Sequence, residues 1–206
     1  MQIPVVEGRL VRLAPLEPAQ ADALAQAAAG ADPELYRWTQ VPRTPEEAGR
    51  YIAAALAMGA AGTAIPYAIV RRADNRVIGS TRIFNLERWA WPAKHERHGR
   101  LEADVAEIGY SWLSAEAIRT GINTEAKLLL LTHCFETLGL LGVCLHADAR
   151  NQRSRAAIER LGAHFDGILR AHRLATDLTA RDSARYSFVV GEWPEVKKRL
   201  TKLLLR

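Results

Sequence analysis

Residues 107–126 have the sequence Glu107-Ile-Gly-Tyr-Ser-Trp-Leu-Ser-Ala-Glu-Ala-Ile-Arg-Thr-Gly-Ile-Asn-Thr-Glu-Ala126, and their hydrophobic period changes halfway along. In the first half, Ile108, Tyr110 and Trp112 alternate with polar or small residues, which is the period of two typical of a strand. Beyond the stretch the period becomes four, at Ala126, Leu130, Cys134 and Leu138. This spacing predicts one apolar face of a helix that follows the strand.

The turn Arg119–Thr124 joins the predicted strand to the predicted helix. The first amides of a helix have no intrahelical acceptor, and the helix dipole adds roughly half a positive charge there. The turn is therefore a candidate phosphate site. It lacks the Lys-Ser/Thr pair of a P-loop and the three glycines of a dinucleotide fingerprint. The alternative interpretation is that Gly121 only turns the chain into the helix.

The segment Thr120-Gly-Ile-Asn-Thr-Glu-Ala-Lys127 resembles motif A of the GNAT acetyltransferases, in the variant of the RimJ/RimL branch. Gly121 matches the first glycine of the family pattern Gln/Arg-x-x-Gly-x-Gly/Ala. Ile118 stands where Gln or Arg is usual, and Asn123 where Gly or Ala is usual. The segment Asn151-Gln-Arg-Ser154, followed by a helix that ends in Leu-Gly, resembles the next CoA-binding segment of that family. The resemblance covers nearly the whole chain.

The resemblance implies a fold of the α/β class, a single GNAT domain over residues 1–206. Its mixed, mostly antiparallel sheet would have flanking helices and would splay between strands 4 and 5. Periodicity and turn residues independently place strands and helices in alternation. Besides strand 107–113, the predicted strands are 8–14, 64–70, 76–86, 140–149, 163–173 and 184–190. The other predicted helices are 18–29, 44–58, 151–162 and one beginning near 192.

The resemblance also implies that acetyl-CoA is the acyl donor. The residues that would bind it are Tyr110, Ser111, Trp112, Leu113, Arg119, Thr120, Gly121, Ile122, Asn123, Thr124, Asn151 and Ser154. Helix capping is the alternative role for Asn151 and Ser154.

Acetyl transfer to an amine requires a proton acceptor, a stabilised oxyanion and a proton donor for the leaving thiolate. In histone-type members, a glutamate placed like Glu107 is the general base, and we expect burial to raise its pKa. The alternative is a structural glutamate bonded to the backbone or to an arginine. Tyr110 and Ser154 are the candidate thiolate acids.

The irregular stretch 87–102 is longer than a hairpin needs, and it carries Trp89, Arg97 and Arg100. We expect these residues to form a positive rim over the acceptor cleft, favouring an acceptor with an acidic or aromatic group and disfavouring a polyamine. Trp38 and His172 are further acceptor-site candidates, with core packing and a structural role as the alternatives. His95 and His98 lie close together, but no cysteine or acid cluster completes a metal site, so no metal is expected.

A net charge of +5 would suit an anionic partner, but the basic residues are spread along the chain, and nucleic-acid binding is not expected. The chain has no long apolar run or signal peptide and only two cysteines, so we expect a cytoplasmic protein with reduced thiols and no membrane partner. A homodimer is left open. The predicted function is direct acetyl transfer, in a ternary complex, to a primary amine of a protein N-terminus or small molecule. The alternatives are a CoA-binding protein with little catalysis and a ribosome- or nucleic-acid-binding module.

Overall fold

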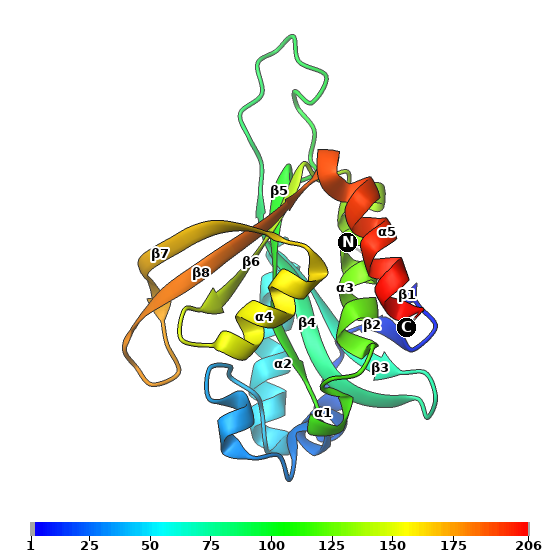
Figure 1. Cartoon of the computed structure of the whole chain (residues 1–206), viewed down its shortest axis with the longest axis vertical. Coiled ribbons are helices and arrows are strands. Elements are labelled where there is room, and N and C mark those ends of the chain that lie inside the picture. Colours follow the sequence, from blue (N-terminus) through cyan, green and yellow to red (C-terminus); the bar gives the residue numbers. More distant parts are fainter. Residues whose placement is uncertain (1–2, 206) are drawn as a thin grey trace.

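The computed structural model describes residues 3–205, which form one eight-stranded sheet with helices on both faces (Figure 1). The strands are β1 (Val6–Glu7), β2 (Val11–Pro15), β3 (Ala64–Arg71), β4 (Arg76–Glu87), β5 (Val105–Leu113), β6 (Gly142–Asp148), β7 (His164–Leu174) and β8 (Ala180–Val189). The α-helices are α1 (Ala21–Ala28), α2 (Pro45–Ala60), α3 (Ile122–Thr132), α4 (Gln152–Leu161) and α5 (Trp193–Leu204). None of the helices in this range is long and apolar enough to cross a membrane.

The strand order is β1-β2-β3-β4-β5-β6-β8-β7, and only β5 and β6 pair in parallel. Their pairing runs from Val105 opposite Gly142 to Glu107 opposite Cys144 and then stops. We call the unpaired continuation the fork, meaning Ile108–Leu113 of β5 and Leu145–Asp148 of β6. The predicted mixed, mostly antiparallel sheet with one splayed strand pair is confirmed. The splayed strands are the fifth and sixth because a two-residue strand, β1, precedes the first one predicted.

Two hydrophobic cores lie on opposite faces of the sheet, as the alternation along β3 shows. Tyr67 and Ile69 belong to the core beneath α3 and α5, whereas Ala68 and Val70 belong to the core beneath α1 and α2. Side chains of a strand alternate between faces, so one continuous apolar strand supplies both cores.

Local signals placed the helix ends correctly. The Thr44 hydroxyl accepts the Glu47 amide at 3.2 Å at the start of α2, and Gly162 ends α4 in the left-handed region, with φ 95°. Two details differ from expectation. β8 begins at Ala180, four residues earlier than predicted, and Leu138 is only half-buried because a π-helical turn, His133–Thr137, follows α3.

The buried carboxylate of Glu125 fixes the start of α3 against β2. It accepts the backbone amides of Arg9 at 2.9 Å, Leu10 at 2.6 Å and Val11 at 2.7 Å. A side chain at position 8 would occupy the same space, since a Cβ on Gly8 would lie 2.6 Å from a Glu125 oxygen. The strand and the first turn of the helix are thus held in one relative position.

We expect Glu125→Ala to lower the free energy of unfolding by about 3 kcal/mol, because three amides lose their acceptor and at least one is buried. Urea unfolding measures this loss. Glu96→Ala, at an exposed position of the loop between β4 and β5, is the control and should unfold like the wild type. Equal stability of the two variants would contradict the role given to Glu125.

Candidate functional site

The first turn of α3 lies at one end of the fork. Gly121 is its N-cap, and the Thr120 hydroxyl accepts the Ile122 amide at 3.2 Å. Within the part of the chain that the structure describes, the amides of Asn123 and Thr124 donate to no protein acceptor. Free amides and the helix dipole suit this turn to an anion, so the candidate phosphate site stays a prediction.

Gly121 has a second function in packing. A Cβ at this position would lie 3.0 Å from Leu10 Cδ1 and 3.5 Å from Leu204 Cδ2. A larger residue would therefore push against β2 and the end of α5 as well as against a phosphate. The preceding Arg119, with φ 63°, makes the tight turn out of β5.

Asn151 and Ser154 lie on the other side of the open end of the fork, where β6 leads into α4. Asn151 Oδ1 accepts the Ser154 amide at 3.0 Å, which is the capping role considered for both residues. The Asn151 side-chain NH₂ group makes no hydrogen bond to residues 3–205, so capping leaves a donor for a ligand.

A β-bulge shapes the edge of β5 that faces the fork. Tyr110 has φ 51°, and the β4–β5 register shifts around it, with Gly109 opposite Arg82 and Trp112 opposite Ser80. The Tyr110 side chain is 42% exposed, whereas those of Trp112 and Leu113 are buried in the two cores. Contact of Trp112 or Leu113 with a cofactor is thereby limited to their backbone.

Glu107 is the last residue of β5 that pairs with β6, and four residues surround its buried carboxylate. Arg173 of β7 donates to both oxygens, at 3.0 and 2.5 Å, and the Asn85 amide donates to Oε2 at 3.0 Å. His146 Nδ1 lies 2.9 Å from Oε1. Cys144, which is opposite Glu107 on β6, is a free thiol.

These contacts reverse the expected pKa shift of Glu107. Burial by itself would raise the pKa, but hydrogen bonds and charge from His146 and Arg173 outweigh burial and lower it below its ordinary value. The expectation of a raised pKa was wrong, because it counted burial and missed an arginine from a distant strand. Glu107 is ionised at neutral pH.

A cavity of about 540 Å³ lies beside this carboxylate. Glu107, His146, His172 and Trp89 are among the residues that line it. The rings of His146 and His172 are 4.8 Å apart. Burial, and then the nearby Arg173, lower the pKa of His172, which favours its neutral form. The structure thus brings two of the predicted acceptor residues, Trp89 and His172, to the same cavity as Glu107.

Donor atoms of Glu107, Cys144 and His146 lie within 4.8 Å of one another, a spacing that a metal ion could bridge. Both oxygens of Glu107 are already bound by the guanidinium of Arg173, whose charge repels a cation. His95 and His98 lie elsewhere, in the loop between β4 and β5. The His95 ring stacks on Trp91 at 4.0 Å, and His98 Nδ1 contacts the Trp91 carbonyl.

The 88–104 loop, between β4 and β5, projects away from the body of the molecule (Figure 1). Asp104 organises it by accepting hydrogen bonds from the Trp89 amide, the Trp91 ring and Arg97. Arg97 also donates to the Gly139 carbonyl at 3.1 Å.

The prediction of a free positive rim was therefore wrong for Arg97. Arg97 is only 16% exposed and is used to hold the loop. Arg100 pairs with Glu102, and neither arginine lines the cavity. Charges brought together by the loop's own fold neutralise one another, which composition alone did not reveal.

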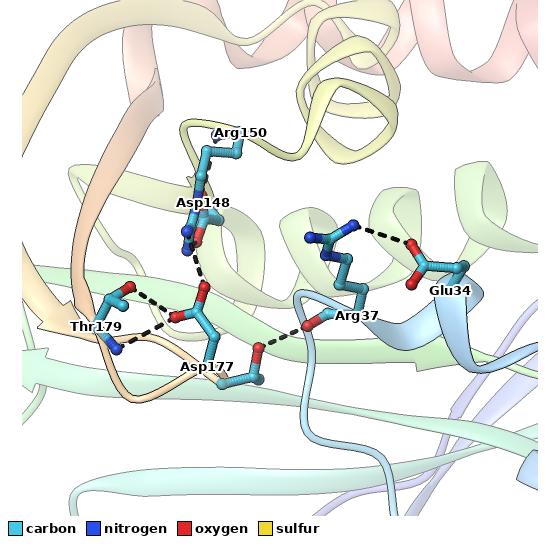
Figure 2. A network of polar contacts seen from close by, with 7 residues as sticks. Glu34, Arg37, Asp148, Arg150, Asp177 and Thr179 are labelled. Atoms are coloured by element: carbon cyan, nitrogen blue, oxygen red, sulfur yellow. Dashed lines mark hydrogen bonds and ion pairs between the residues drawn. The ribbon is translucent and has the colours of Figure 1, made fainter.

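Trp38 lies at the open end of the fork and not in a core. Its ring stacks on the guanidinium of Arg150 at 4.2 Å. Arg150 binds both Asp148 and Asp177, and the Thr176 hydroxyl donates to the Arg37 carbonyl at 2.6 Å (Figure 2). This network joins three segments across the end of the fork: 33–38, the β6–α4 turn and the β7–β8 turn.

Sequence reasoning missed Lys127, a buried residue of α3. Its amine donates to Ser111 Oγ at 2.6 Å, and Ser111 Oγ lies 2.7 Å from the Thr81 hydroxyl. Burial lowers the pKa of Lys127 to about 7. A signal was present, because Lys127 precedes the buried residues Leu130, Leu131 and Cys134 by three, four and seven positions, which places it on the buried face.

Comparison with known proteins identifies the family that this arrangement resembles. Residues 10–164 match the model of the "Acetyltransferase (GNAT) domain" family. A candidate ribosomal N-acetyltransferase of Bacillus subtilis (strain 168), YdaF, is 39% identical over 88 residues, which are 43% of this chain and 47% of YdaF. The match thus spans about half the length of that curated relative.

Solved structures agree over almost the full chain. A candidate acetyltransferase from T. thermophilus is 32% identical, with 99% of each chain covered and a TM-score of 0.78. RimJ of Mycobacterium smegmatis, solved in complex with CoA-disulfide, is 21% identical, covers 98% of this chain and 95% of its own, and has a TM-score of 0.79. At that identity RimJ supports the fold. The family match favours acetyl transfer from acetyl-CoA over the two alternatives considered from the sequence.

We expect Lys127→Met to raise the free energy of unfolding at pH 7 by about 2 kcal/mol, because it removes a buried amine. The folded-state pKa of about 7 lies below the ordinary 10.5, so between these values the unfolded chain binds more protons. The cost of the wild-type lysine should therefore fall as the pH rises from 7 to 10. Urea unfolding across this range tests it, with the exposed Lys198→Met as control. A stability difference between Lys127→Met and the wild type that does not change with pH would contradict the lowered pKa of Lys127.

Glu107→Gln should lower the free energy of unfolding at pH 7 by roughly 1–3 kcal/mol, because Arg173 and His146 lose a charged acceptor. A lowered pKa stabilises the fold above the ordinary value of 4.5, and this contribution disappears as the pH falls through the folded-state pKa. Urea unfolding should therefore show the difference between variant and wild type shrinking in acid. A difference that grows below pH 4.5 would disprove the lowered pKa.

Proposed function

This chain belongs to the GNAT acetyltransferase family, and from that premise we propose that it acetylates the α-amine at the N-terminus of a protein. Acetyl-CoA is the acyl donor of that domain. The amine attacks the thioester carbonyl directly, in a ternary complex, so a C–N bond forms as the C–S bond breaks. CoA leaves as its thiol after taking up a proton.

The observation that carries this proposal is the fork. β5 and β6 separate after Glu107, and their carboxyl ends lead to the first turn of α3 and to the Asn151 turn. The free amides of the α3 turn suit the pyrophosphate, and the free Asn151 side-chain donor suits the amide-rich pantetheine arm. A thioester held between these points lies along the bulged edge of β5.

The backbone at Tyr110 and Ser111 is the proposed oxyanion site, because the bulge leaves this edge of β5 unpaired with β6. Tyr110, which is half-exposed, and Ser154 are the candidate donors of a proton to the thiolate. Lys127 donates to the Ser111 hydroxyl and thereby fixes the side chain next to the bulge.

Glu107 is the candidate proton acceptor on the cavity side of the fork. Its lowered pKa keeps it deprotonated at neutral pH, but a base whose pKa lies far below the working pH removes protons inefficiently. We therefore assign most of the rate to the positioning of the amine against the thioester, and less to proton abstraction by Glu107.

The choice of a protein N-terminus draws on the relative named as a candidate ribosomal N-acetyltransferase. The cavity supports it in one respect. It is open and about 540 Å³ in volume, enough for the first residues of an extended peptide rather than for a single small amine.

Thiol release from acetyl-CoA tests the proposal with three acceptors: a peptide with a free N-terminus, the same peptide N-terminally blocked but containing a lysine, and spermidine. We expect turnover with the first only, because the open cavity of about 540 Å³ can hold and position the first residues of a peptide and leaves a slender polyamine unpositioned. Calorimetry with acetyl-CoA provides a separate control for donor binding. Equal turnover of spermidine, or of the blocked peptide, would exclude an N-terminal acceptor.

A further inference from the structure

Two arginines face each other across the hairpin that covers the fork. Arg173 of β7 and Arg181 of β8 are direct partners in the antiparallel register. Like charges opposite each other in a sheet repel and destabilise the strand pair. Arg173 is compensated, because both oxygens of Glu107 accept its hydrogen bonds. Arg181 has no such partner among the residues that the structure describes.

Arg181 is only partly exposed, and its Nε–H is buried without an acceptor. It forms no hydrogen bond or ion pair with any residue between 3 and 205. Burial, followed by the charge of Arg173, lowers its pKa from the ordinary value. An unpaired, partly buried cation lowers the stability of the fold, and no hydrogen bond of Arg181 to residues 3–205 offsets this cost.

The carboxylates near Arg181 are all bound elsewhere. Asp148 accepts three hydrogen bonds from Arg150, and Glu107 is held by Arg173 and Asn85. Asp177, in the β7–β8 turn, accepts hydrogen bonds from Arg150 and Thr179, as Figure 2 shows. The charges of Asp148 and Glu107 act on Arg181, but neither carboxylate accepts a hydrogen bond from it.

The position of Arg181 places it close to Glu107 and His172, beside the cavity but not among the residues that line it. Direct cross-strand partners share one face of a sheet, and Arg173 reaches Glu107 from that face. Arg181 also lies beyond the last β6–β8 pair, Asp148 with Ser183, and so next to the open end of the fork. The contacts of Thr176 with the Arg37 carbonyl and of Asp177 with Arg150 hold the hairpin in this place.

We propose that Arg181 is a specificity residue that binds a carboxylate of the acceptor, so the preferred acceptor is a peptide with an acidic side chain close to its N-terminal amine. This inference rests on the proposed function and names its substrate class. The acceptor's carboxylate supplies the counter-ion that Arg181 lacks within the described residues. The selectivity that the sequence suggested for Arg97 and Arg100 is thereby assigned to the β7–β8 hairpin.

The experiment compares three peptides that differ only at the residue after the N-terminal serine, which is Glu, Gln or Lys. Thiol release gives kcat/KM for each with the wild type, Arg181→Met and Arg170→Met. Arg170 is an exposed arginine of the same hairpin and serves as the matched control. For the wild type and Arg170→Met we expect the Glu peptide to exceed the Gln peptide on the order of tenfold, with the Lys peptide lowest. In Arg181→Met this ratio should fall to about twofold or less, mainly through KM.

A second measurement separates specificity from stability. Because Arg181 is unpaired within the described chain, Arg181→Met should melt at the same temperature as the wild type or higher, with acetyl-CoA affinity unchanged. A melting temperature more than about 4 °C lower would make Arg181 a structural residue and overturn the proposal.

The remaining outcomes are also decisive. Turnover of all three peptides with equal kcat/KM, or a Glu preference that survives in Arg181→Met, would overturn the acidic subsite and leave N-terminal acetylation intact. Failure to acetylate any peptide, with acetyl-CoA still bound, would overturn the proposed function and this inference with it.

Discussion

The ion pair between Glu107 and Arg173 is the interaction on which the candidate site depends. Beyond Glu107, β5 and β6 are no longer held together by backbone hydrogen bonds, so another contact must fix their relation. The carboxylate provides it by contacting Asn85 of β4, His146 of β6 and Arg173 of β7. One buried charge thus connects four strands at the point where the sheet opens.

A buried ion pair is a poor source of net stability, since desolvation offsets most of the attraction. Here the ion pair fixes the position of β7 relative to β5. β7 is an edge strand, and many of its residues are exposed. Few apolar contacts therefore fix the position of the β7–β8 hairpin. Arg173 and the Arg150–Asp177 network both lie near the turn of the hairpin and hold that end over the fork, and Figure 2 shows the network.

The donor side and the acceptor side of the site offer different polar groups to their ligands. The donor side offers free backbone amides at the start of α3, a kind of group that can bind phosphate without a fixed cation. The acceptor side carries two arginines and two histidines together with the acids Glu87, Glu107 and Asp166, and its arginines are paired with Glu107 and Asp166. Arg181, on the same hairpin as Arg173, bonds to no acid in the described chain.

The sequence by itself determined the order of strands and helices, the caps at Thr44 and Asn151, and the turn at Gly121 that begins α3. These features are local, because period, capping and turn chemistry act within a few residues. Only the tertiary structure decided what Glu107 does. Its partners Asn85 and Arg173 lie 22 and 66 residues away, and they lowered a pKa that burial alone would have raised. In the same way, folding neutralised Arg97 with Asp104 and left Arg181 unpaired within the described residues, because electrostatic partners are set by distances in space and not along the chain.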